Sequence, residues 1–193
     1  MEVELKKEVV MLIRNYFRVL VVLIITVNLI SCTQKTKDSK IVKTEVNKAI
    51  CLLYPTQGSE TMGTVTFSQK ADGMLIIADV KGLSPGKHGF HIHEYGDCSQ
   101  PDGKSAGGHF NPTSKNHGGP NSEDRHVGDL GNLIAKDDGT AHYEWTDKLL
   151  SFSGPNSILG RAIIVHADED DLISQPTGNA GARIACGVIG TAN

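Results

Sequence analysis

The chain has 193 residues, of which 39% are hydrophobic and 21% charged, so it holds enough apolar material for one folded domain and too much for general disorder. Glycine occurs 21 times while aromatic residues make up only 5%, which favours an all-β chain with many turns. Residues 47–193 contain 11 Lys and Arg against 17 Asp and Glu, a net charge of −6. This acidity argues against a nucleic-acid partner, because binding to nucleic acid depends mostly on neutralising phosphates.

The N-terminal segment has the features of an export signal. Basic residues up to Arg18 precede an apolar run at 19–30, which has the length of a signal-peptide core and is short for a membrane span. The run ends in Leu29-Ile30-Ser31-Cys32, which resembles the lipobox of bacterial lipoproteins, where the Cys is lipidated and becomes the new N-terminus. We therefore expect a lipoprotein signal peptide at 1–31, starting at Met1 or Met11. An ordinary cleaved signal and an uncleaved anchor are the alternatives.

The remaining chain divides by composition. Residues 32–46 are rich in Lys, Thr and Ser and predict a lipidated Cys followed by a flexible tether, and residues 47–193 form the folded domain. Short apolar segments between turn signals predict its strands at 49–54, 63–68, 74–80, 88–93, 129–135, 140–146, 161–166 and 183–189. These strands suit a sandwich or a flattened barrel. The connection at 94–126 exceeds the usual loop length, and long ordered loops are usually functional.

Histidines gather in and around this long loop. His91 and His93 stand two apart on a predicted strand, so both rings project from one face, as a metal site needs, although the pair alone is a weak signal. A second set can complete a closed tetrahedral zinc site, and it comprises His109, His117, His126 and Asp129. For any single loop histidine, a solvated surface residue is the alternative. His166 ends an apolar strand, where a ligand and a capping polar residue are both open. Imidazole suits copper and zinc alike, so residue type does not decide the metal.

Five segments, in this order, resemble the copper–zinc superoxide dismutase family. They are His88-Gly-Phe-His-Ile-His93, Gly108-His-Phe-Asn-Pro112, His117-Gly-Gly-Pro120, Arg125-His-Val-Gly-Asp-Leu-Gly131 and Gly178-Asn-Ala-Gly-Ala-Arg-Ile-Ala-Cys-Gly187. The resemblance covers residues 47–193 and implies an all-β, eight-stranded Greek-key β-barrel or sandwich with long metal-binding loops. It also implies an oxidoreductase, a superoxide dismutase with one copper and one zinc per subunit, which converts superoxide to dioxygen and hydrogen peroxide.

The resemblance assigns roles to individual residues. It implies copper ligands at His91, His93, His109 and His166, and zinc ligands at His109, His117, His126 and Asp129, with His109 bridging the two metals. It implies that Asp170 hydrogen-bonds a ligand of each metal, which fixes ring orientation. His109 and Arg183 are the expected catalytic residues, Arg183 by attracting and orienting superoxide. His88 matches a packing histidine beside the ligands, whereas His142 matches nothing and is expected on an exposed strand surface.

The resemblance to the family extends to two cysteines, but one loop departs from it. Cys98 and Cys186 match the disulfide of the family, which leaves Cys51 as a free and buried thiol. Residues 171–178 form a shorter segment than the matching loop of many eukaryotic relatives and contain no Lys, so the strength of electrostatic steering is open. The segment Gly187-Val-Ile-Gly190 resembles one that dimeric relatives use for pairing, and a homodimer and a monomer both remain open.

Together these features predict a lipoprotein held in a bacterial cell envelope through Cys32, at the outer membrane or periplasm, that protects the envelope from superoxide. The alternative is a non-enzymatic copper-binding lipoprotein of the same fold. A zinc hydrolase is disfavoured, because four protein ligands in the second set leave no position for water.

Overall fold

A computed structural model describes residues 6–18 and 45–193 of the chain, which divides into two units, Met1–Lys43 and Thr44–Asn193. In the first unit, residues 6–18 are helical. No helix in the described ranges has the length and apolar character needed to span a bilayer. The predicted signal-peptide core at 19–30, Cys32 and most of the tether lie outside the described residues.

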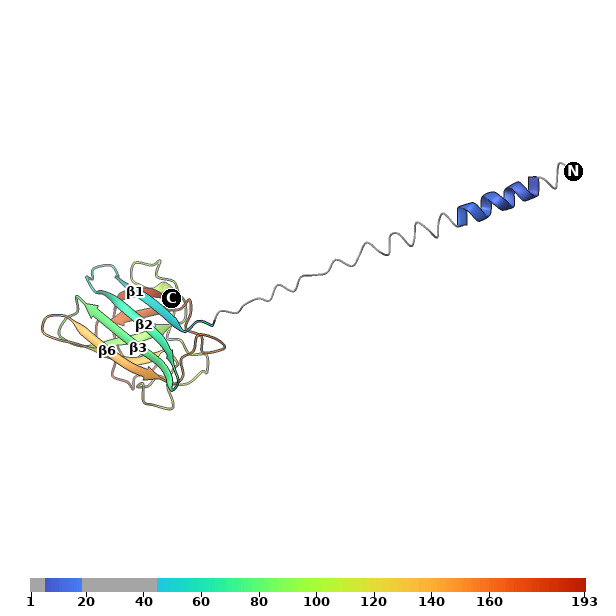
Figure 1. The fold of residues 1–193 in the computed structure, drawn as a ribbon. Coiled ribbons are helices and arrows are strands. Elements are labelled where there is room, and N and C mark those ends of the chain that lie inside the picture. The colour runs from blue at the N-terminus through green and yellow to red at the C-terminus, as the bar shows by residue number, and fades with distance from the viewer. Residues whose placement is uncertain (1–5, 19–44) are drawn as a thin grey trace. The chain divides into compact units, whose positions relative to one another are not determined.

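The second unit is an all-β barrel (Figure 1). Its eight strands are β1 (Lys48–Pro55), β2 (Met62–Lys70), β3 (Gly73–Lys81), β4 (Gly86–His93), β5 (Asp129–Ala135), β6 (Ala141–Asp147), β7 (Ala162–His166) and β8 (Arg183–Thr191), with one 3-10 helix, η1 (Lys104–Ala106). All eight strands were predicted, and their ends differ from prediction by no more than two residues.

The strands form one antiparallel sheet in the order β5-β4-β7-β8-β1-β2-β3-β6. The β3–β4 and β6–β7 connections join strands that are not neighbours, which is the Greek-key pattern. The two edge strands approach each other, because the Tyr143 hydroxyl of β6 donates to the Leu130 carbonyl of β5 at 3.0 Å. The barrel is therefore nearly closed, as the fold prediction required.

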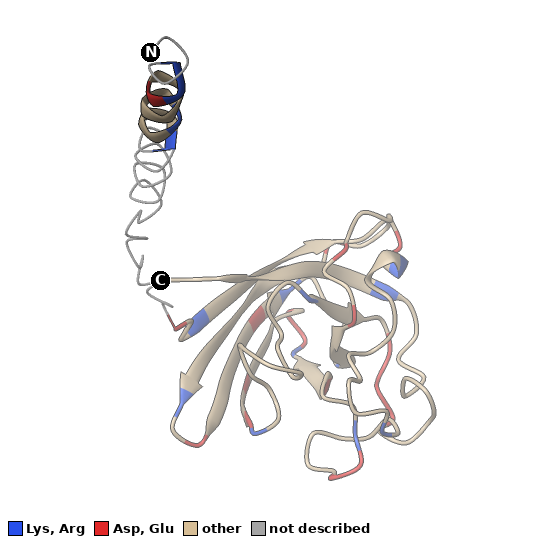
Figure 2. Ribbon diagram, turned by 90° about the vertical axis from the view of Figure 1, so that its right-hand side faces the viewer, with Lys and Arg blue, Asp and Glu red and all other residues tan. Residues whose placement is uncertain are grey.

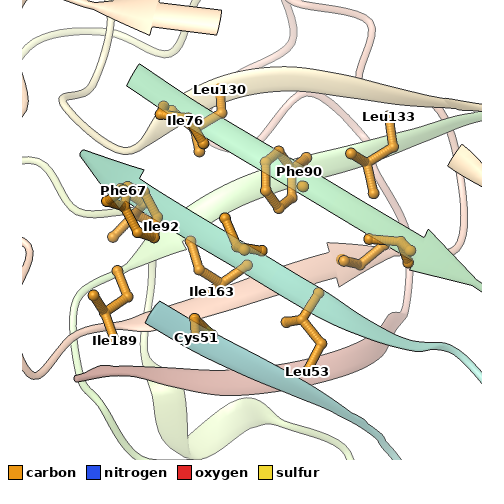
Figure 3. Packing of buried hydrophobic residues seen from close by; sticks show 14 of the residues in the cluster. Cys51, Leu53, Phe67, Ile76, Phe90, Ile92, Leu130, Leu133, Ile163 and Ile189 are labelled. Carbon is orange, nitrogen blue, oxygen red and sulfur yellow. The ribbon is translucent and has the colours of Figure 1, made fainter. Parts of the chain in front are cut away.

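Alternating side chains fill the barrel. In β1 and β3 every second residue is buried, which is the period-two pattern of a sheet with one face on the core. Figure 3 shows the buried side chains of the core converging from several strands, among them Cys51 and Leu53 from β1, Phe90 from β4 and Ile163 from β7. Charged residues lie mainly in the turns and loops, as Figure 2 shows. The barrel therefore provides an apolar frame, and its loops carry the polar chemistry.

Candidate metal centre

Backbone hydrogen bonds hold the long loop between β4 and β5 against β4. The amide of Ile92 donates to the Gly128 carbonyl, and the amide of Phe110 donates to the Ile92 carbonyl, both at 2.9 Å. A Cβ at Gly128 would lie 2.2 Å from the Ile92 carbonyl oxygen, so only glycine permits this approach. The implied disulfide is present between Cys98 and Cys186 and ties the same loop to β8. The loop histidines are thereby brought against the strand that carries His91 and His93.

Four histidines meet at this junction. His91 and His93 come from β4, and His166 comes from the end of the neighbouring β7. His109 comes from the loop, where its backbone pairs with that of His93 in an isolated antiparallel β-bridge. All four are buried, and one ring nitrogen of each lies within 4.8 Å of the others. We call these residues the strand set.

A second group lies beside it and shares His109. His109, His117, His126 and Asp129 are also buried, and one ligand atom of each lies within 4.8 Å of the others. Asp129 Oδ1 is central, at 2.8 Å from His109 Nδ1 and 3.1 Å from the Nδ1 atoms of His117 and His126. We call these residues the loop set. The structure thus brings all seven predicted ligands together in the two predicted groups.

Asp170 links the two sets by accepting a hydrogen bond from one histidine of each. Its Oδ2 accepts from His91 Nε2 at 2.7 Å, and its Oδ1 accepts from His117 Nε2 at 2.9 Å. The side chain of Asn132 holds the Asp170 backbone, accepting from its amide and donating to its carbonyl, both at 2.8 Å. Asp170 is completely buried. It therefore fixes one ring in each set, in the position that the sequence assigned to it.

The hydrogen bonds determine which nitrogens are free. His93 Nδ1 donates to the Gly107 carbonyl at 2.9 Å and His166 Nδ1 donates to the Gly181 carbonyl at 3.2 Å, which leaves both Nε2 atoms with a lone pair. Asp170 has the same effect on His91 and His117, whose Nδ1 atoms are then free. Partners of this kind are typical of metal-ligating histidines.

The donor atoms fit metal ions. His91 Nδ1, His109 Nε2 and His117 Nδ1 are buried without a hydrogen-bond partner, which is costly unless another ligand satisfies them. Converging imidazoles suit copper or zinc, and three imidazoles with one carboxylate suit a closed zinc site. His109 has a nitrogen for each set, because Nδ1 faces Asp129 while Nε2 is the atom without a partner.

The two sets differ in charge. Burial lowers the pKa of His91, and it lowers the pKa values of His93 and His166 much further. Burial opposes charge on His117 too, but the close carboxylate of Asp129 and the hydrogen bond to Asp170 outweigh it and raise the His117 pKa to about 9. Burial would raise the pKa of Asp129, yet its three histidine partners hold that pKa well below its usual range. The strand set is thus neutral, while the loop set combines an ionised Asp129 with a His117 that has to lose a proton before its Nδ1 can bind a metal.

Arg183, the first residue of β8, lies beside the strand set. Its guanidinium donates to the Gly103 carbonyl at 2.7 Å and to the Gly107 carbonyl at 2.6 Å. The Gly107 carbonyl also accepts from His93 Nδ1, so one oxygen connects the arginine to a histidine of the strand set. Burial lowers the Arg183 pKa from its very high ordinary value, and the side chain keeps its positive charge. It is therefore a fixed cation next to neutral imidazoles, suited to attracting a small anion.

Two further histidines behave as predicted. His88 is buried, and its Nδ1 donates to the backbone carbonyl of His166 at 2.9 Å, so it packs beneath a member of the strand set. His142 is exposed on β6, where its Nδ1 lies 2.7 Å from Asp79 Oδ1.

Sequence reasoning missed three supporting residues, Asn132, Gln175 and Arg125. The buried Arg125 guanidinium donates to the carbonyls of His126, Val127 and Asp129 and forms an ion pair with Asp147 of β6. Arg125 stands in a charged run after Glu123 and Asp124, where it resembles an ordinary surface residue. It begins one of the segments that resemble the family, but only the tertiary structure shows which groups it holds.

Comparisons with known proteins agree with this geometry. A family model described as copper/zinc superoxide dismutase (SODC) matches residues 61–189. A curated protein named extracellular superoxide dismutase [Cu-Zn], from Brugia pahangi, is 48% identical over 155 residues, which cover 76% of this chain and 77% of that protein. A crystal structure described as the clock protein EA4 is 42% identical with a TM-score of 0.71, covering 77% of this chain and 97% of that chain.

Proposed function

Because this chain belongs to the copper/zinc superoxide dismutase family, we propose that the strand set holds its copper and the loop set its zinc, with His109 shared between them. The chain is an oxidoreductase that converts two superoxide ions and two protons to dioxygen and hydrogen peroxide. The observation that carries the assignment is the two-sided contact of His109, with Nδ1 towards Asp129 and a buried, unpartnered Nε2.

The residues around the strand set serve the reaction in distinct ways. When bound, copper supplies a one-electron couple that successive superoxide ions reduce and reoxidise, and zinc supplies positive charge without redox chemistry. Arg183 attracts the anion and orients it beside the strand set. Burial of the histidines excludes bulk water from their inner faces. His109 Nε2 can hold a proton for the product, because Nδ1 is kept towards Asp129.

The test is the dismutation rate of the mature chain loaded with copper and zinc, measured beside its metal-free form and free copper. A fast rate that requires both the protein and copper is expected. One copper and one zinc bound per chain, with no activity above that of free copper, would instead favour a copper-binding protein of the same fold.

We further propose that the chain is exported and, in a bacterial envelope, acylated on Cys32 at the outer membrane or periplasm, where it removes superoxide. Export is supported by the basic residues and the apolar run, and by the word extracellular in the name of the Brugia pahangi relative. Acylation is supported by the Leu29-Ile30-Ser31-Cys32 sequence alone. Mass spectrometry of the mature N-terminus should find a fatty-acylated Cys32, and Cys32→Ser should release the protein from membranes. An unmodified N-terminus would indicate a soluble secreted enzyme.

We also propose that two copies pair through β1 and β8. Leu52 and Tyr54 of β1 and Val188 of β8 are exposed side chains that line one shallow apolar hollow. Sedimentation analysis should give a dimer mass for the wild type and a monomer mass for Val188→Lys. A monomer at all concentrations for the wild type would contradict the proposal.

A further inference from the structure

The short segment at 171–178, between β7 and β8, has a structure of its own that the proposed reaction does not use. The Asp171 carboxylate accepts from the backbone amides of Ile173 and Ser174 at 3.0 and 2.7 Å. Its other oxygen accepts from the Asn179 side chain at 3.1 Å. These bonds hold the segment in a compact turn, so its side chains project in fixed directions.

Gln175 projects from this turn onto His117. Its Oε1 accepts from the His117 amide at 2.8 Å, and its Nε2 donates to the His117 carbonyl at 2.9 Å. An amide side chain that engages both backbone groups of one residue fixes the position of that residue and the direction in which its side chain leaves the backbone. His117 lies in an irregular part of the chain between β4 and β5, where no strand partner performs this task.

The direction of the His117 side chain matters because both ring nitrogens have assigned places. Nε2 donates to Asp170 at 2.9 Å, while Nδ1 lies 3.1 Å from Asp129 Oδ1 without hydrogen-bond geometry and faces the loop set. A shift of the backbone would move Nδ1 away from the other ligands. Gln175 therefore acts on the only end of His117 that Asp129 and Asp170 do not hold.

A second feature places the same segment over the loop set. Gly178 has a φ of +67°, and a Cβ there would lie 1.8 Å from Asp170 Oδ1 and 2.6 Å from His117 Nε2. The backbone thus passes directly over the hydrogen bond between Asp170 and His117, at a distance that only glycine allows. Residues 171–178 contain no Lys or Arg, so nothing in the segment attracts an anion.

From these contacts we infer that Gln175 is a positioning residue of the zinc centre, and that the segment 171–178 serves to retain zinc. The inference rests on the proposed assignment of zinc to the loop set. It gives this short segment a role in holding the metal, in place of the steering that its sequence lacks.

The test uses the mature chain loaded with copper and zinc and measures zinc release to a chromogenic chelator. Gln175→Met keeps the length of the side chain and removes both hydrogen bonds to His117. Its zinc release should be about tenfold faster than that of the wild type, the lower end of the range for residues that support metal ligands. With Co²⁺ in place of zinc, the visible absorption bands should shift, because the angle of one ligand has changed.

A matched variant separates this role from general loop stability. Ile173→Ala changes an exposed side chain of the same turn and leaves the hydrogen bonds of its backbone in place. It should release zinc within about twofold of the wild-type rate, since this side chain makes no hydrogen bond to His117. Zinc release at the wild-type rate from Gln175→Met, or equal acceleration by Ile173→Ala, would overturn the inference.

Failure of the underlying assignment gives a different result. If the wild type takes up no zinc, or if His117→Ala retains zinc as firmly as the wild type, the loop set does not hold zinc and the proposed function fails first. If wild-type zinc depends on His117 but not on Gln175, only the inference about Gln175 fails.

Discussion

The two halves of the metal centre are built from different kinds of structure. In the strand set, His91, His93 and His166 stand on hydrogen-bonded neighbours, β4 and β7, whose opposite faces line the apolar core. In the loop set, His117 and His126 come from irregular backbone between β4 and β5. The barrel therefore fixes the first half through its sheet, whereas side-chain hydrogen bonds must fix the second.

The difference extends to charge. The strand set is neutral, and each of its strand-borne rings donates to a carbonyl or to Asp170. The loop set is arranged around the Asp129 carboxylate, which also accepts from the backbone amides of Gly118 and His126. An ion in the loop set would thus organise the loop as well as occupy it, because its ligands belong to the segment that it closes.

The largest expected effect comes from removing one ligand from each half. His93→Ala should abolish protein-dependent activity, lowering it to that of free copper, while the zinc content stays near one per chain. His126→Ala should lose zinc and keep copper together with part of the activity. Metal analysis by mass spectrometry, together with a cytochrome c reduction assay, measures both outcomes.

Loss of the same metal from both variants would contradict the assignment of one metal to each set. His142→Ala is the control, because this histidine is exposed on β6 and belongs to neither set. It should keep both metals and full activity.

Asp170→Asn tests the connection between the halves. The substitution keeps the shape of the side chain but leaves only one acceptor oxygen for His91 and His117, so one of the two rings loses its partner. Loss of such a partner typically lowers metal affinity about 10–100-fold. Competition with chelators should show which metal is weakened. Unchanged affinity for both metals would mean that the strands and the loop orient these rings without Asp170.

Local patterns predicted the strand-borne half better than the loop-borne half. The two-residue spacing of His91 and His93 on an apolar strand already places both rings on one face. His126 and Asp129 are also close in sequence, but only the folded loop brings His117 to them. The partners that hold the rings are farther away still: Asp170 lies 53 residues from His117, and Gln175 lies 58 residues from it. Resemblance to the family supplied the role of Asp170. It also included Arg125 in a matching segment, but without a role, and nothing local in the sequence marks Gln175 or Asn132.

Arg183→Lys examines the charge beside the strand set without removing it. Lysine cannot reproduce the pair of bonds that the guanidinium makes to the carbonyls of Gly103 and Gly107. The catalytic rate should fall about tenfold, the lower end of the range for electrostatic guidance, while both metals remain bound. Dismutation rates over a series of salt concentrations provide the measurement, and Lys87→Arg is a surface control. Loss of copper in Arg183→Lys would show instead that the Gly107 carbonyl supports His93 only when the arginine is present.

The smallest effect concerns the barrel alone. Burial raises the pKa of the Cys51 thiol from 9.0 to about 12. In the unfolded chain the thiol ionises near its ordinary pKa, so its contribution to stability is complete below pH 9 and is lost as the pH rises towards 12. At pH 10 the loss should be about 1.4 kcal/mol, one pKa unit of linkage.

Urea unfolding of the metal-free protein at pH 8 and pH 10 measures this loss, with Cys51→Ala as the partner variant. Alanine removes the thiol, so the difference in stability between the two proteins should change by that amount between the two pH values. Tyr143, whose pKa burial also raises, is present in both proteins and cancels from the comparison. A constant difference would mean that Cys51 is accessible to solvent, and that the core beneath the strand set is less closed than the packing of β1 against β8 requires.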